Sequence, residues 1–269
     1  MFRDCRSGGV GAGRARAKCR WLAVLLAAAG CFGAAQAAPN AVDRPVLRFI
    51  VGEDWVSPYL ELRAGQPVGG LAFELMEAVA RAADARPEYL MLPPKRTQAA
   101  LHEGQADLMC MMSPKWLAQP LAADRVGPPM AVLEDVLAVV PGAGDARPLN
   151  LAAQHGLRVG TVLGYRYQEL GPLFDDGRLV REDAATQQGV LEKLARGRTE
   201  AAVVDRLVLA QYNRSHPPAE RLQALQVVSQ TVTTCLLGAG NRMPARRLQL
   251  ALRAVVDRGE LARLMQRYR

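Results

Sequence analysis

"ALHEGQADLM" (residues 100–109) and "KLARGRTEAAV" (residues 193–203) share one pattern at two distant places in the chain. In each stretch a glycine follows a leucine after two residues, and an acidic residue and an apolar run come next. Such a glycine is typical of the position just past a helix end, and the apolar run predicts a buried strand. The chain therefore contains a helix–turn–strand unit twice. The two units share this pattern of elements but are not a close sequence repeat.

Strands and helices alternate around these two units. Apolar runs that end in glycine, proline or polar residues predict strands at 46–55, 88–93 and 156–165, and residues 70–83 have the apolar periodicity of an amphipathic helix. This alternation is typical of an α/β protein with largely parallel sheets, and its repetition predicts two lobes.

Two further strand-like runs, 132–142 and 232–240, flank the second block and predict two crossover strands between the lobes. The C-terminal helical segment, 244–268, would then return to the first lobe. We expect lobe 1 to comprise residues 40–138 plus 235–269, and lobe 2 to comprise residues 139–234.

The first 37 residues have the pattern of an export signal. A basic region ends at Arg20, an apolar stretch follows, and Ala35-Gln36-Ala37 fits the small-x-small cleavage rule. We expect cleavage before Ala38 and a soluble protein in the periplasm. A membrane anchor and lipidation of Cys31 are the alternatives for this segment.

The net charge of +8 gives no indication of a nucleic-acid partner. Residues 1–37 hold six basic residues and one acidic residue, a net +5, so the remainder carries only +3. No basic run in that remainder is long enough to follow a phosphate backbone. We therefore expect no nucleic acid among the partners.

Two cysteines, Cys110 and Cys235, remain after the predicted leader. An even pair in an oxidising compartment can form a disulfide. Each cysteine also lies in an apolar, strand-like run, where a buried free thiol packs as a small hydrophobic side chain. The sequence leaves both alternatives open.

Five motifs in order carry a family resemblance: "VGEDWVSPY" (51–59), "GLAFELMEAVA" (70–80), "ALHEGQADLM" (100–109), "GLRVGTVLGY" (156–165) and "EAAVVDRLVLAQY" (200–212). They resemble the periplasmic solute-binding proteins of the polar amino-acid ABC-transporter family. The resemblance implies a two-lobe type II periplasmic-binding fold with a hinge. It also implies a monomer without cofactor, which binds a small polar solute in the interlobe cleft and presents it to an inner-membrane ABC permease.

Polar and aromatic residues follow the predicted strands, where ligands of α/β sheets bind. The candidate ligand-binding residues are Asp54, Trp55, Arg96, Met112, Ser113, Lys115, Trp116, Gly164, Tyr165, Arg166 and Asp205. Some have structural alternatives: Trp55 can pack beneath its loop, and Arg96 can be a solvated residue in the first turn of a helix.

One departure from the family pattern concerns the residue that binds the carboxylate of the ligand. Amino-acid binders of this family usually carry an arginine in a Ser/Thr-Pro-x-Arg motif, but "SPKW" puts Trp116 at that place. Either Lys115 substitutes as a point charge, or the ligand has no carboxylate there. The resemblance assigns Asp205 to the ligand amino group, and a strand-end cap or a surface ion pair is its structural alternative.

The methionines of "DLMCMM" (107–112) raise the question of a copper site. Successive side chains of a strand point to opposite faces, so Met109 and Met111 should not share a coordination shell with Cys110 and Met112. We predict a buried strand and no metal site.

Catalysis has little support in the sequence. Three scattered histidines, His102, His155 and His216, form no nucleophile–base motif. The same fold hosts sensory modules and periplasmic dehydratases, for which Asp54 and Asp205 are the one acid–base pair to nominate. We expect a binding protein rather than an enzyme.

Overall fold

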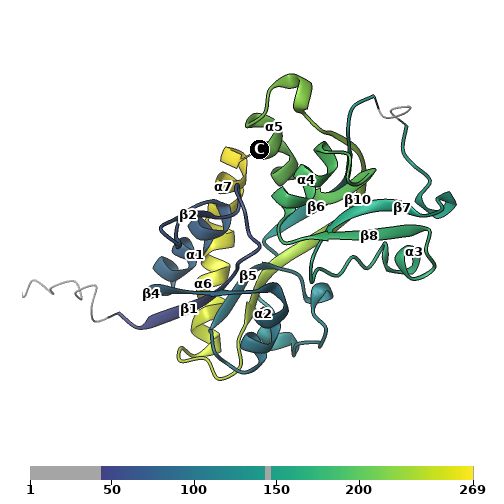
Figure 1. The fold of residues 1–269 in the computed structure, drawn as a ribbon. Helices are drawn as coiled ribbons and strands as arrows, with labels where there is room; N and C mark the ends of the chain where they lie inside the picture. Colours follow the sequence, from purple (N-terminus) through teal and green to yellow (C-terminus); the bar gives the residue numbers. More distant parts are fainter. Residues whose placement is uncertain (1–43, 143–146, 269) are drawn as a thin grey trace, which may run out of the picture. The chain divides into compact units, whose positions relative to one another are not determined.

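The computed structural model describes residues 44–142 and 147–268 (Figure 1). Its strands are β1 (Val46–Gly52), β2 (Glu61–Arg63), β3 (Gln66–Gly69), β4 (Arg86–Leu92), β5 (Leu108–Met112), β6 (Ala131–Val139), β7 (Leu157–Val162), β8 (Leu179–Ala184), β9 (Ala201–Asp205) and β10 (Gln223–Leu237). Its α-helices are α1 (Leu71–Ala82), α2 (Pro94–His102), α3 (Gly171–Asp175), α4 (Gln187–Ala195), α5 (Arg206–Arg214), α6 (Ala245–Asp257) and α7 (Glu260–Tyr268).

The predicted leader, its cleavage site and Cys31 lie outside the described residues. Among the helices of 44–142 and 147–268, none combines the length and the apolar character needed to cross a bilayer.

Eight strands form one sheet in the order β4-β1-β5-β10-β6-β9-β7-β8. Strand β1 pairs in parallel with β4 and β5, and β7 pairs in parallel with β8 and β9, so the sheet has two parallel halves. Between them, β6 and β10 are antiparallel to each other. This arrangement confirms the predicted two-lobe α/β fold with two crossover strands.

The second crossover strand differs in extent from the sequence prediction. Strand β10 begins at Gln223 rather than near residue 232, because polar residues in its first half interrupt the apolar pattern. Helices α6 and α7 pack against α1, so the C-terminal segment returns to the first half of the fold (Figure 1). The exact lobe boundaries stay a prediction.

The structure contains both of the predicted helix–turn–strand units. Helix α2 leads into β5 and helix α4 leads into β9, with Gly104 (φ 71°) and Gly197 (φ 67°) in the left-handed conformation after each helix. Glycine adopts this conformation without the steric cost that a Cβ imposes.

The acidic residue of each unit has an equivalent role. Asp107 accepts a hydrogen bond from the backbone N–H of Arg48 at 2.8 Å, and Glu200 accepts one from the backbone N–H of Arg158 at 3.0 Å. Each arginine side chain also pairs with its carboxylate. The Asp107 pair is buried and the Glu200 pair is half exposed, so equivalent ion pairs lie in two different environments.

Strand β5 contains a β-bulge at the methionine run. Met109 is opposite Leu236 and Met112 is opposite Thr234, so β5 carries one residue more than β10 over this interval. Met111 has a φ of 55°, which a non-glycine residue rarely adopts. The bulge places Met111 with Cys110 in one core cluster and Met112 with Met109 in another. The predicted alternation of faces is therefore wrong here.

A disulfide joins Cys110 of β5 to Cys235 of β10, which resolves the two alternatives for these cysteines. It links segments 125 residues apart in sequence, next to the bulge. The disulfide therefore ties the first parallel half of the sheet to a crossover strand.

Candidate ligand-binding site

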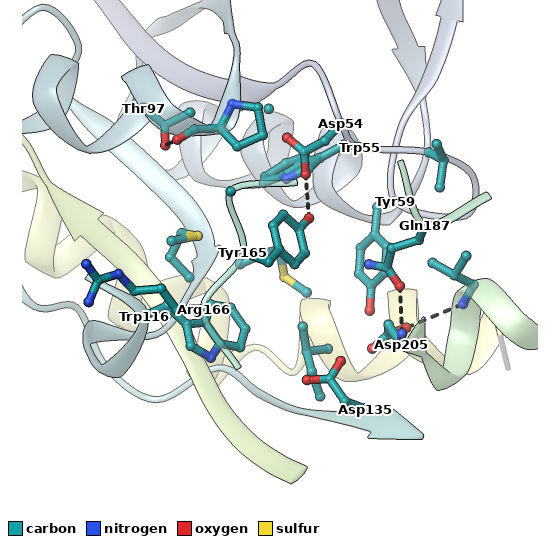
Figure 2. Close-up of a pocket in the computed structure, with 18 of the residues that line it drawn as sticks. Asp54, Trp55, Tyr59, Thr97, Trp116, Asp135, Tyr165, Arg166, Gln187 and Asp205 are labelled. Atoms are coloured by element: carbon teal, nitrogen blue, oxygen red, sulfur yellow. Dashed lines mark hydrogen bonds between the residues drawn. The ribbon is translucent and has the colours of Figure 1, made fainter. Parts of the chain in front are cut away.

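A cavity of about 140 Å³ lies where loops and strand ends of both parallel halves converge (Figure 2). Eight of the predicted residues line it: Asp54, Trp55, Met112, Trp116, Gly164, Tyr165, Arg166 and Asp205. The volume is small for a ligand pocket, because pockets for larger organic ligands usually exceed about 300 Å³. The space therefore suits a small solute.

Three predicted residues are outside the lining of this cavity. Arg96 is exposed in the first turn of α2, as its structural alternative predicted, and Lys115 is exposed in a short 3₁₀ helix (Pro114–Trp116). Ser113 is buried at the start of that 3₁₀ helix. Their roles in binding stay a prediction.

Asp205 is the last residue of β9 and the N-cap of α5. Its Oδ1 accepts hydrogen bonds from the backbone N–H groups of Leu207 at 2.8 Å and Val208 at 3.4 Å. The side chain is 4% exposed, and burial raises its pKa to about 7, with the nearby Asp135 carboxylate adding to the increase. Asp205 thus combines the predicted cap with a position on the cavity.

Asp135, in crossover strand β6, is directly opposite Asp205 in the antiparallel β6–β9 pair. Its Oδ2 accepts a hydrogen bond from the Ser229 hydroxyl at 3.0 Å. Burial raises the pKa of Asp135, and the charge of Glu169 adds to this effect. Asp135 is not among the ligand-binding residues predicted from the sequence.

Asp54 follows β1 and is also 4% exposed. It accepts a hydrogen bond from the Tyr165 hydroxyl, which reaches it from the loop after β7 (Figure 2). Burial raises the pKa of Asp54, and the Tyr165 bond opposes that shift. A Cβ at Gly52 would be 2.4 Å from an Asp54 oxygen, so a larger residue there would displace the Asp54 carboxylate.

Aromatic side chains form much of the remaining wall. Trp55, Tyr59, Trp116, Tyr165 and Tyr167 all line the cavity. The buried Tyr59 hydroxyl faces the Asp205 carboxylate without ideal hydrogen-bond geometry, and this interaction opposes the rise in the Asp205 pKa that burial causes. A ligand with an acceptor or a flat surface could complete this environment.

The cavity's charge is unbalanced. Within residues 44–142 and 147–268, no lysine, arginine or histidine forms an ion pair with Asp54, Asp135 or Asp205. Arg166 is on the lining but is an exposed residue. Uncompensated buried carboxylates favour either a proton or a cationic ligand.

Several lining residues were missed at the level of sequence: Tyr59, Thr97, Gln98, Asp135 and Gln187. Gln187 begins α4, and its Oε1 accepts a hydrogen bond from the Asp205 backbone N–H at 2.6 Å. Asp135 could have been recognised because Glu134 and Asp135 interrupt the apolar run 132–142. A strand buried on both faces would not carry two acidic residues.

No protein-family model and no curated protein sequence matches the chain. Solved structures do match. An ancestral arginine-binding protein bound to arginine aligns with a TM-score of 0.65 and 19% identity, covering 84% of this chain and 98% of that one. The ancestral amino acid-binding protein AncCDT-1, a precursor of cyclohexadienyl dehydratase, aligns with a TM-score of 0.67 and 15% identity, covering 85% and 97%.

A third match is the VFT2 domain of BvgS from Bordetella pertussis, with a TM-score of 0.62 and 18% identity, covering 85% of this chain and 95% of that domain. Together these likenesses define the class of fold, which is that of the type II periplasmic-binding proteins. At this level of identity they establish the fold, and the function is argued from the cavity.

Proposed function

We propose that the chain is a periplasmic solute-binding protein that captures a small polar solute, an amino acid or an amine-like compound, for an inner-membrane ABC permease. The observation that carries this proposal is the convergence of two buried aspartates, Asp54 and Asp205, the half-buried Asp135 and several aromatic residues on one cavity. Small-molecule sites typically combine an apolar wall with a few polar groups whose pKa values are perturbed.

The comparisons support the choice of solute class. One solved structure with this fold is an arginine-binding protein from Salmonella typhimurium, and another is the substrate-binding protein of an amino-acid ABC transporter. The acid-rich cavity is compatible with ligands that carry an amino group.

Two other functions share the fold. The likeness to the BvgS domain supports a sensory role, in which a membrane receptor replaces the permease as partner. The likeness to AncCDT-1 supports a dehydratase, for which Asp54 and Asp205 are both on the lining with raised pKa values. Binding without turnover is the simpler proposal, since it requires no proton transfer between these residues and the ligand.

Binding is tested by a thermal-shift screen of amino acids, amines and small carboxylates, followed by calorimetry on each hit. A bound solute should raise the melting temperature and reduce the radius of gyration in small-angle scattering, as expected for closure around a ligand. The ligand recovered after incubation should be chemically unchanged. A hit that the protein converts to product would contradict pure binding, and absence of any hit would contradict the function.

The transport role needs a separate measurement. Deleting the gene should reduce cellular uptake of the radiolabelled ligand, and size-exclusion chromatography with light scattering should show a monomer. Normal uptake together with a lost transcriptional response to the ligand would favour the sensory role instead.

A further inference from the structure

Asp135 and Asp205 form a cross-strand pair of like charges. They are register partners in the antiparallel β6–β9 pair and both line the cavity. Directly opposed residues on one face of a sheet have Cβ atoms about 5 Å apart, and like charges at that place are destabilising. Figure 2 shows both side chains beside the same space. A purely structural role gives no reason for this pairing.

The protein itself engages only part of each carboxylate. Backbone N–H groups at the start of α5 bond to Oδ1 of Asp205, and the Ser229 hydroxyl bonds to Oδ2 of Asp135. Among the described residues no other group donates to Asp135, and the Tyr59 hydroxyl is the one further side-chain partner near Asp205, so both carboxylates can also accept from a cation in the cavity. A primary ammonium has three donors and a guanidinium has five, so either can bridge two carboxylates at once.

We propose that Asp135 and Asp205 together clamp one ammonium or guanidinium group of the ligand, and that this ligand is an organic cation without a carboxylate. The inference rests on the proposed binding function and narrows its solute class. It assigns Asp135, which the sequence did not single out, as a determinant of specificity.

The rest of the lining argues against a carboxylate on the ligand. Asp54 adds a third acid to the same cavity, and its partner is a tyrosine hydroxyl rather than a cation. Neither Arg96 nor Lys115 is on the lining, and Arg166, which is on the lining, is exposed to solvent rather than buried in the cavity. A ligand carboxylate in this space would need a buried cationic partner, and leaving it unpaired is costly. The tryptophans, tyrosines and methionines suit an apolar or flat ligand body instead.

Matched pairs of solutes test the proposal by calorimetry on protein purified after expression of the full chain. Agmatine and arginine differ only by a carboxylate, as do cadaverine and lysine. We expect at least one of the two amines to bind about tenfold or more tightly than its amino-acid counterpart. Equal or tighter binding of both amino acids would overturn the proposal.

Asp135→Asn tests the clamp itself, because it removes one charge with almost no change in shape. It should weaken amine binding about tenfold or more, whereas the exposed control Asp257→Asn on α6 should leave affinity unchanged. Removing the like-charge repulsion should also raise the melting temperature of the ligand-free variant. Unchanged amine affinity in Asp135→Asn would overturn the role of this residue.

A second readout uses the unmodified protein, and it remains available if the variant does not fold. Calorimetry near neutral pH in buffers with different ionisation enthalpies reports protons released on binding. Seating a cation between the two carboxylates should release a measurable fraction of a proton, because a cation favours their ionised form. Amine binding without proton release would contradict the clamp.

The outcomes also separate this inference from the function on which it rests. If a zwitterionic or anionic solute binds and closes the protein while the amines do not, the inference fails and the binding function stands. If no solute in the screen binds, both fail.

Discussion

The Tyr165 hydroxyl donates a hydrogen bond to the Asp54 carboxylate, and this bond connects the loop after β7 with the loop after β1. The two loops belong to different parallel halves of the sheet. Burial and the adjacent Asp54 carboxylate raise the pKa of Tyr165, so the phenol stays protonated and remains a donor at neutral pH. The contact can therefore stabilise the two halves around the cavity.

A double-mutant cycle measures the strength of this contact. Tyr165→Phe and Asp54→Ala should each reduce the free energy of unfolding, since each leaves a buried polar group without its partner. Their effects should be non-additive, with a coupling of about 1–3 kcal/mol by denaturant unfolding. Additive effects would mean that the hydroxyl and the carboxylate do not stabilise one another.

Asp205 predicts an unusual dependence of stability on pH. Its pKa is raised to about 7 in the folded protein, against about 3.9 in an unfolded chain. Between these values the folded protein binds more protons than the unfolded protein, so the free energy of unfolding falls as pH rises. The ligand-free protein should gain up to about 4 kcal/mol from this group between about pH 8 and pH 4.

Melting temperatures of wild type and Asp205→Asn across that range isolate this contribution. Asparagine is also a good N-cap, so the variant preserves the start of α5. The difference between the two proteins should favour wild type progressively as pH falls. A difference that does not change with pH would show that Asp205 titrates normally.

The local parts of the fold were predictable because their signals are local. A glycine after an apolar helical face and a following apolar run define the α2–β5 and α4–β9 units without any long-range information. The strand-end candidates Asp54, Tyr165 and Asp205 followed from the same logic, because ligands gather at the carboxyl ends of parallel strands.

The remaining features depend on pairings that a single sequence does not reveal. Asp135 acquires its significance only because β6 pairs with β9 in one particular register. The methionine run was misinterpreted because the alternation rule assumes a regular strand, and the bulge at Met111 has no glycine to indicate it. Lys115 is adjacent to Trp116 in sequence, yet it is exposed while Trp116 lines the cavity.

The Cys110–Cys235 disulfide should contribute substantially to stability. It closes a long loop, with 125 residues of sequence separation, and native disulfides of this kind typically contribute about 2–5 kcal/mol. The Cys110→Ala/Cys235→Ala double variant should therefore unfold at lower denaturant concentration than the oxidised protein. Reductant should lower the midpoint of wild type and leave that of the variant unchanged. A reductant effect on both proteins would point to another cause.

The arginine–acid pairs of the two helix–turn–strand units allow the effect of burial on ion-pair stability to be measured within one protein. Asp107 is fully buried beside Arg48, whereas Glu200 is 51% exposed at its side chain beside Arg158. Breaking a buried pair leaves an uncompensated charge, so Asp107→Asn should cost about 3 kcal/mol of unfolding free energy. Glu200→Gln should cost less than about 1 kcal/mol, because water screens and replaces the lost interaction. Urea denaturation of both variants gives the comparison. Equal losses would mean that position in the repeated unit, and not burial, sets the energy of the pair.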